Sequence, residues 1–397
     1  MADQSFILSA PGKVILHGEH AVVYGKIAIA IGVNLRTFLR LQPCDNGKVT
    51  LSLPNTDTHV SWNLHELESL TSAYYQNDLV NPLPLLPEQI EKLRQFSGIP
   101  AGDADTRILA VLAFLYLYLS IFAKSRLPSL KIVVWSELPT GAGLGSSAAY
   151  SVCMAAALLN AGSVISHCPL DGVETARWNE NELDIINKWA FQGEKIIHGN
   201  PSGVDNAVGT WGGALKYKAG EITPLKRVPV LRILLTNTKV PRSTKILVAG
   251  VRDRLKKFPG IINPVLDSID AVSCKCEHVL EEIAEHPSLS HYCVLEELFD
   301  INQQHLNVLG VGHPSLDRLC QVTLSHGLHS KLTGAGGGGC GITLLRPDTD
   351  ASVIVAVLQE LRDCGYDCWE TNIGAPGVSL HVPSALREEI LHAVSGL

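Results

Sequence analysis

Hydrophobic positions along the chain follow two periodicities, which predict a mixture of strands and helices. Short β-branched apolar runs predict strands at residues 5–10, 27–41, 49–53, 130–138, 228–237, 366–371 and 377–382. Apolar residues three and four positions apart predict helices at 105–123, 147–160, 181–198, 263–286, 290–309, 313–326 and 351–363. Strands and helices in this order, without a regular βαβ repeat, predict an α+β fold.

Turn-forming residues such as Gly, Pro and Asn mark where some of these elements end. Asp45-Asn46-Gly47 predicts a hairpin turn between strands 27–41 and 49–53, and Pro54-Asn55 ends the second of them. The polar, proline-bearing stretch 63–97 predicts an excursion with short helices. Gly212-Gly213 begins a predicted strand pair that ends near Lys226.

The 397 residues suffice for two domains and a sizeable core. The predicted elements change near Arg227, where a strand pair ends and a strand followed by a largely helical region begins. We therefore expect an N-terminal domain over 1–227 and a C-terminal domain over 228–397. In this division the first glycine-rich loop lies in the N-terminal domain and the second lies in the C-terminal domain.

Charge and composition exclude some classes of protein. The net charge of −7 and the lack of a basic tail argue against binding to nucleic acid. Ten cysteines occur without a secretory signal and are expected to be reduced thiols. The spacings of Cys274, Cys276, Cys364 and Cys368 are not those of a zinc ribbon.

The sequence predicts a cytoplasmic protein without a membrane anchor. Residues 108–123 are apolar, but this run is shorter than the ~20 residues that a membrane span needs, so a buried helix is expected. The pairs Lys13-Val14 and His20-Ala21 also have the spacing of an N-terminal peroxisomal signal. Since these residues are expected in the core of the site, a peroxisomal location is the weaker alternative.

A glycine-rich segment, PTGAGLGSSAA at residues 139–149, joins the predicted strand 130–138 to the helix at 147. A strand, a glycine loop and a helix N-terminus together favour anion binding, because free N–H groups and the helix dipole point at the ligand. A turn capped by Ser146 or Ser147 fits the same pattern. Ser146 stands where a Walker A loop needs Lys, and Asp171 is not on the second strand that a Rossmann motif requires.

Two other segments carry charged or ionisable side chains in unusual positions. Residues 10–20 place Lys13, His17, Glu19 and His20 among apolar neighbours. Glu194 lies in the last turns of helix 181–198. A carboxylate there is unfavourable for the helix dipole, which suggests that Glu194 has a functional rather than a structural role.

The turn GNPSGVD at 199–205 delivers Asp205 to an apolar run, either as a functional carboxylate or as a turn-capping side chain. The glycine tract 334–339 lies between two strand-like runs, and such a tract favours a backbone nest for an anion over a flexible linker.

The order and spacing of residues 11–20, 139–149 and 333–340 resemble the GHMP kinases, the family of galactokinase, homoserine kinase, mevalonate kinase and phosphomevalonate kinase. Within the family, the segments 13–25 and 199–205 are similar to those of animal members that phosphorylate mevalonate, and the similarity extends over nearly the whole chain. The resemblance implies a two-domain α+β architecture with mixed sheets, an active site in the cleft between domains, and ATP with Mg²⁺ as cofactors.

The resemblance also implies roles for individual residues. Asp205 is expected to be the general base, and Lys13 is expected to activate the hydroxyl and to neutralise the γ-phosphate. Ser147 and Glu194 would bind Mg²⁺, while Ser146 would stay on the phosphates. The expected nucleotide-binding residues are Lys13, Asn55, Ser136, Gly141, Ala142, Gly143, Leu144, Gly145, Ser146, Ser147, Gly334, Ala335 and Gly336. The expected substrate residues are Glu19, His20 and Thr244.

Several further expectations follow from the resemblance: mevalonate and ATP as ligands, feedback inhibition by prenyl diphosphates at the ATP site, and a homodimer. Two alternatives stay open. One is a GHMP kinase for phosphomevalonate or a sugar, for which Arg242 and Lys245 would supply extra basic groups. The other is a non-catalytic relative that regulates a partner; this would require the loss of base or metal ligands, which the chain retains.

Overall fold

The computed structural model describes residues 5–74, 78–83, 86–98, 105–139, 141–170 and 172–395. Thr140 of the first glycine-rich segment, Asp171 and parts of the predicted excursion at 63–97 lie outside these ranges. No helix in the part of the chain described here is long and apolar enough to cross a membrane.

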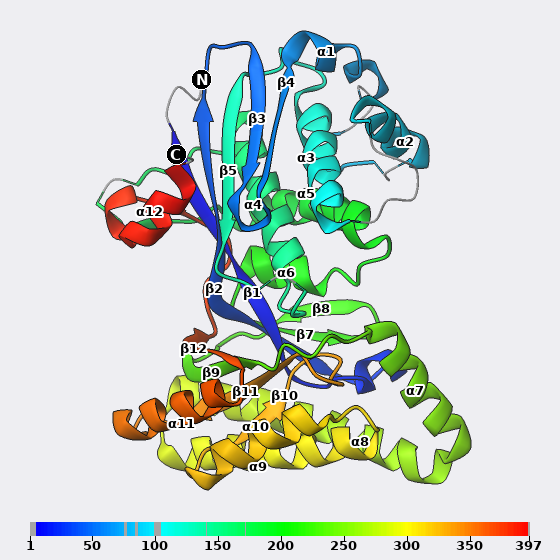
Figure 1. The fold of residues 1–397 in the computed structure, drawn as a ribbon, viewed down its shortest axis with the longest axis vertical. Coiled ribbons are helices and arrows are strands. Elements are labelled where there is room, and N and C mark those ends of the chain that lie inside the picture. The colour runs from blue at the N-terminus through cyan, green and yellow to red at the C-terminus, as the bar shows by residue number, and fades with distance from the viewer. Residues whose placement is uncertain are drawn as a thin grey trace.

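Strands and helices of the described residues have the following bounds (Figure 1). The strands are β1 Phe6–His17, β2 Ala28–Pro43, β3 Lys48–Leu53, β4 Thr58–Asn63, β5 Leu130–Ser136, β6 Thr175–Ala176, β7 Ala214–Lys218, β8 Glu221–Pro224, β9 Leu231–Asn237, β10 Ser330–Leu332, β11 Cys340–Leu345, β12 Asp367–Ile373 and β13 Ser379–His381. The helices are α1 Leu64–Glu68, α2 Pro87–Phe96, α3 Thr106–Phe122, α4 Ser146–Ala161, α5 Glu180–His198, α6 Val204–Trp211, α7 Thr244–Lys257, α8 Pro259–Glu285, α9 Leu289–Val308, α10 Pro314–Ser325, α11 Ala351–Asp363 and α12 Glu388–Ser395.

Strand β2 is the centre of the sheet. It pairs along its length with β1, and on its other edge it pairs in turn with β7, β12 and β5. Its side chains are almost continuously buried, because both faces of the strand are covered. All pairings in the described residues are antiparallel except that of β3 with β5, so the predicted mixed α+β class is confirmed.

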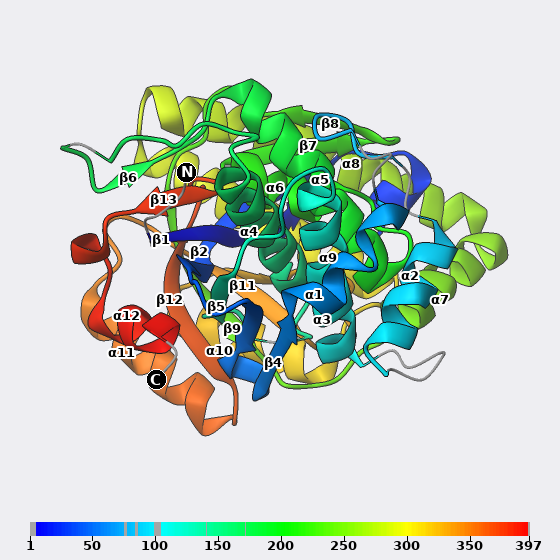
Figure 2. The ribbon, with the colours of Figure 1, turned by 90° about the horizontal axis from the view of Figure 1, so that it is seen from above.

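Helices cover the sheet on both faces. Seen from above in Figure 2, α3, α4 and α5 lie on one side of β1 and β2, and α12 lies on the other. Helix α3 is enclosed from Val111 to Phe122, which confirms that the apolar run at 108–123 is a core helix. Helices α7 to α11 form the lower half of the molecule with β9 to β12 (Figure 1).

The hairpin predicted at Asp45-Asn46-Gly47 is wrong. Strand β5 lies between β2 and β3, antiparallel to the first and parallel to the second. Asn46 accepts hydrogen bonds from Lys48 N and from the hydroxyl of Ser129, which precedes β5. The loop is therefore held to the incoming strand, and β3 forms its hairpin with β4 instead.

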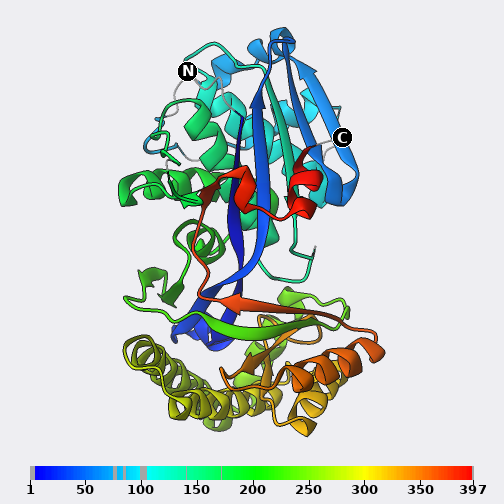
Figure 3. The same ribbon diagram turned by 90° about the vertical axis from the view of Figure 1, so that its left-hand side faces the viewer.

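The C-terminal segment returns to the upper half of the molecule (Figure 3). Strand β13 pairs with β1, and α12 packs Ile390 and Val394 with Ile7 and Phe38. Strands β1 and β2 reach from the upper half into the lower half (Figure 1). The domain boundary at Arg227 stays a prediction.

Candidate active site

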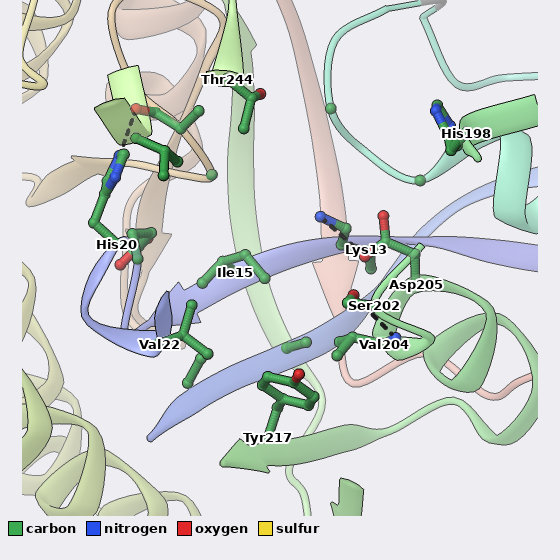
Figure 4. A pocket seen from close by; sticks show the side chains of 18 of the residues that line it. Lys13, Ile15, His20, Val22, His198, Ser202, Val204, Asp205, Tyr217 and Thr244 are labelled. Atoms are coloured by element: carbon green, nitrogen blue, oxygen red, sulfur yellow. Dashed lines mark hydrogen bonds and ion pairs between the residues drawn. The ribbon is translucent and has the colours of Figure 1, made fainter. Parts of the chain in front are cut away.

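A cavity of about 630 Å³ lies where the two halves of the molecule meet. Its lining comes from β1, the N-terminal ends of α4, α6 and α7, the last residue of α5, and the second glycine-rich loop. In Figure 4, Lys13 and Asp205 lie near its centre, His198 and Thr244 lie on different sides, and Val204 and Tyr217 lie below them. Three segments far apart in the sequence therefore share one cavity.

The first glycine-rich loop packs directly on β1. Gly145 has a φ of 75° and opens α4, a backbone conformation that a side chain would strain. The N–H of Lys13 donates to the carbonyl of Leu144 at 2.8 Å, and a Cβ at Gly145 would lie 3.2 Å from Cγ of Lys13. The helix N-terminus predicted from the sequence is thus held beside the lysine.

The positions of the loop divide into two groups. Gly141, Gly143, Gly145 and both serines line the cavity. Ala142 and Leu144 are buried and pack in the hydrophobic core beneath it. The alternation explains how the loop is anchored by two apolar side chains while its glycine backbone faces the cavity.

Lys13 and Asp205 form an ion pair at the centre of the cavity. The Nζ atom of Lys13 lies 3.3 Å from Oδ1 of Asp205. The Lys13 side chain is 11% exposed, whereas the Asp205 side chain is 38% exposed and open to a ligand. Gly203, at φ 83°, opens α6 so that Asp205 sits in its first turn, where the helix dipole favours a carboxylate.

The two residues predicted as metal ligands lie on adjacent helices. The Ser147 hydroxyl, in the first turn of α4, lies 2.8 Å from Nε2 of His198. Glu194, one turn before His198 on α5, is buried and accepts a hydrogen bond from the Ser151 hydroxyl at 3.4 Å. The Ser147 side chain is close enough to Glu194 to lower the pKa of its carboxyl, so the predicted ligands lie near each other.

The charge balance at Glu194 fits a cation. Burial raises the pKa of this carboxyl to about 7, and the nearby Asp205 carboxylate adds to the rise. A hydroxyl that donates to His198 still has lone pairs for a metal. Three clustered His, Cys, Asp or Glu side chains are not found in the described chain, but Mg²⁺ commonly uses one or two carboxylates together with substrate phosphates.

The second glycine-rich loop faces the first across the cavity, and Arg242 lies between them. Nη2 of Arg242 donates to the carbonyl of Ala142 at 2.6 Å. A Cβ at Gly143 or Gly339 would collide with the same guanidinium. Gly334 and Ala335 line the cavity, whereas Gly336 packs against the carbonyl of Val311 and is not among the lining residues.

The three predicted substrate residues line one end of the cavity. His20 places Nε2 2.8 Å from the carbonyl oxygen of Ala335, as the dashed line in Figure 4 shows. Thr244 is the first residue of α7, whose N-cap is Ser243. Glu19 has a fully buried side chain that forms an ion pair with Lys331.

Asn55 and Ser136 lie together but outside the lining of this cavity. The Asn55 amide donates to the carbonyl of Ser136 at 2.9 Å and accepts from its N–H at 2.8 Å. This reciprocal pair joins the end of β3 to the end of β5, which leads to the first glycine-rich loop. Their assignment to the nucleotide stays a prediction.

Sequence reasoning did not assign a role to two residues of this region, His198 and Lys331. His198 is the last residue of α5, and its contact with Ser147 depends on how α4 and α5 cross. The sequence offers one signal for Lys331, its position just before the second glycine tract. Its partner Glu19 lies 312 positions away in the sequence.

Comparisons with known proteins agree with this geometry. The family model described as GHMP kinases N terminal domain matches residues 109–213, and GHMP kinases C terminal matches 292–363. Mevalonate kinase of Homo sapiens is 62% identical over 399 residues and covers 100% of both chains. Mevalonate kinase of Bos taurus is 60% identical over 398 residues, again with 100% of both chains covered.

A crystal structure of L. major mevalonate kinase in complex with R-mevalonate shares the fold, with a TM-score of 0.66 and 22% identity, and covers 94% of this chain and 97% of that one. The chain belongs to the GHMP kinase family. Within the family it groups with the mevalonate kinases over its full length, and it is therefore a phosphotransferase.

Proposed function

We propose that the protein transfers the γ-phosphate of ATP to the C5 hydroxyl of mevalonate and so forms 5-phosphomevalonate. The observation that carries the proposal is the Lys13–Asp205 pair, 3.3 Å apart, in a cavity that also receives the N-terminal ends of α4 and α6. Both helix ends favour anions, as the phosphates of a nucleotide require.

In the proposed transfer, Asp205 accepts the proton of the C5 hydroxyl. The hydroxyl oxygen then forms a bond to the γ-phosphorus, while the bond from that phosphorus to the β,γ-bridging oxygen breaks and ADP leaves. Lys13 stabilises the developing alkoxide and the charge on the transferred group. The Lys13 side chain is only 11% exposed and is therefore held in position, so little reorganisation is needed during the step.

We propose that the first glycine-rich loop binds the phosphates through backbone N–H groups and Ser146, and that the second loop covers them from the other side. The carboxylate of Glu194 and the hydroxyl of Ser147 would hold Mg²⁺. When bound, the metal neutralises charge on the β- and γ-phosphates. His198 keeps the Ser147 hydroxyl oriented by accepting or donating one hydrogen bond.

Arg242 bears on the choice of acceptor. A phosphorylated acceptor requires additional basic groups in its subsite. The Arg242 guanidinium lines the cavity and donates to the carbonyl of Ala142 through Nη2, whereas Lys245 is not among the lining residues. Full-length similarity to mevalonate kinases favours mevalonate over phosphomevalonate as the acceptor.

The test is an ADP-release assay with mevalonate, phosphomevalonate and galactose at matched concentrations. We expect turnover with mevalonate, with the other two acceptors slower by orders of magnitude. Turnover with either of them in place of mevalonate would overturn the proposal. Inhibition by prenyl diphosphates, a homodimer and a cytoplasmic location stay predictions from the family resemblance.

A further inference from the structure

A fully enclosed charge pair lies directly behind the wall of the cavity where the acceptor is proposed to bind. The side chains of Glu19 and Lys331 are both 0% exposed and form an ion pair. The Asn302 amide donates to the second oxygen of Glu19 at 2.9 Å, and the Lys331 ammonium also donates to the carbonyl of Leu332 at 2.7 Å. Each oxygen of this carboxylate is therefore held by a separate donor.

The pair belongs to a set of contacts between the end of β1 and the second glycine-rich loop. His20 lies 2.8 Å from the carbonyl of Ala335. The Thr333 hydroxyl accepts from the N–H of Ile15 and donates to its carbonyl, both at 2.9 Å. Residues 15–20 and 331–335 thus make contacts at three points, and Glu19, His20 and Ala335 also line the cavity.

The fold alone gives little reason for a charged pair at this position. Replacing an enclosed ion pair with apolar residues of the same volume is often neutral or stabilising, because both charges lose their hydration. The surroundings of Lys331 are largely apolar, with its ammonium 5.9 Å from the ring centre of Phe299. Burial raises the pKa of the Glu19 carboxyl, and the Lys331 ammonium and the Asn302 amide oppose that rise.

We infer that Lys331 is a positioning residue for the acceptor alcohol: with Asn302, it holds the enclosed Glu19 carboxylate and so fixes residues 19 and 20, including the His20 side chain, on the cavity wall where the acceptor binds. This inference rests on the proposed function. Lys331 itself does not line the cavity, so it acts through Glu19. Because the first glycine-rich loop and Ser146, which are proposed to bind the nucleotide phosphates, make none of these contacts, loss of Lys331 weakens acceptor binding far more than ATP binding.

The first test compares Lys331→Met with the wild-type protein. We expect the KM for mevalonate to rise at least about tenfold, because residues 19 and 20 of the cavity wall are no longer fixed, while the KM for ATP stays within about twofold. Titration calorimetry of mevalonate alone should show the same loss of affinity. Lys216→Met, which removes the 2.8 Å pair with Glu277 outside the cavity, is the control and should leave both constants unchanged.

A double variant separates positioning from folding. Glu19→Gln with Lys331→Met removes both charges together, so the unpaired carboxylate of Lys331→Met is gone. We expect its KM for mevalonate to match that of Glu19→Gln alone within about twofold, even if Lys331→Met alone does not fold. A further tenfold rise in the double variant would show that Lys331 acts elsewhere and would overturn the inference.

Two other outcomes would also overturn it: an unchanged KM for mevalonate in folded Lys331→Met, or an equal rise in the KM for mevalonate and for ATP. If the wild-type protein does not phosphorylate mevalonate, it is the proposed function that fails. The wild-type assay therefore distinguishes the two failures.

Discussion

Nζ of Lys13 lies 3.3 Å from Oδ1 of Asp205, although the two residues come from a strand near the start of the chain and a helix near its middle. The pair joins a nearly buried cation to a partly exposed carboxylate at the centre of the cavity. In this arrangement the carboxylate can accept a proton while the ammonium stabilises the anion that results.

Substitution of this carboxylate tests its role as the base. Asp205→Asn should lower kcat by about 10² to 10⁴, because the amide cannot accept the hydroxyl proton. Nucleotide affinity, measured by fluorescence titration, should change little. Asp184→Asn, which removes a surface partner of Lys188, is the matched control; a similar loss of kcat in both variants would contradict the assignment.

Glu194 should make the metal-free protein less stable as the pH rises. Its pKa is raised from 4.5 to about 7 in the fold by burial and by Asp205, so the folded state favours the protonated form. Stability is therefore lost between pH 4.5 and about 7 and stays low above that.

Glu194→Gln removes this penalty. We expect its unfolding free energy at pH 8 to exceed that of the wild type by up to about 3 kcal/mol, with a much smaller difference at pH 5. Urea unfolding in the presence of a chelator measures it. A gain that is the same at both pH values would show that the carboxyl does not titrate as described.

His381 should contribute to acid unfolding with the opposite sign. Burial, and then the nearby Arg36 charge, lower its pKa from 6.5 to about 4, and Nε2 lies 2.7 Å from the Ser9 hydroxyl. The unfolded state takes up a proton below pH 6.5 that the folded state does not, so stability falls from pH 6.5 to about 4.

His381→Gln should reduce that fall by up to about 3 kcal/mol. The measurement is denaturant unfolding between pH 8 and pH 4. Values above pH 7, where both forms of the protein carry a neutral side chain at this position, supply the baseline. Parallel pH curves for the variant and the wild type would exclude a contribution from His381.

Two glycine substitutions should have opposite effects on stability. Gly339 has a φ of 70°, and a side chain there would collide with Arg242. Gly339→Ala should therefore cost at least about 1–2 kcal/mol. Gly250 lies inside α7 with open space around it, so Gly250→Ala should stabilise the protein by about 1 kcal/mol. Thermal unfolding compares the two, and a stabilised Gly339→Ala would contradict the packing around Arg242.

Much of the secondary structure followed from periodicity. Helices with several apolar turns, such as α4 and α5, were predicted to within about a residue at each end, because a long repeat leaves little ambiguity. Short elements were missed: β4, α6 and α12 have too few residues for a period to show. Asp45-Asn46-Gly47 has the residues of a hairpin turn, but β2 and β3 do not pair with each other. Strand β5, which comes much later in the chain, lies between them.

The candidate site could be predicted as residue types but not as contacts. Glycines, a lysine and a carboxylate in suitable segments indicated phosphate chemistry, and the structure brings Lys13, Ser147, Glu194 and Asp205 together. The contact of Ser147 with His198 and that of Glu19 with Lys331 depend on tertiary packing. No spacing in the sequence encodes a pair 312 positions apart.

The pairing of β1 with β13 has a consequence for synthesis of the protein. Ser9 and His381 are 372 positions apart, yet they are hydrogen-bonded neighbours. During translation, β1 leaves the ribosome long before its partner exists, so one edge of this strand stays open until residues 379–381 emerge. An exposed strand edge is prone to pair with other chains, and the upper half of the molecule is therefore most exposed to misassembly before the C-terminal segment is made.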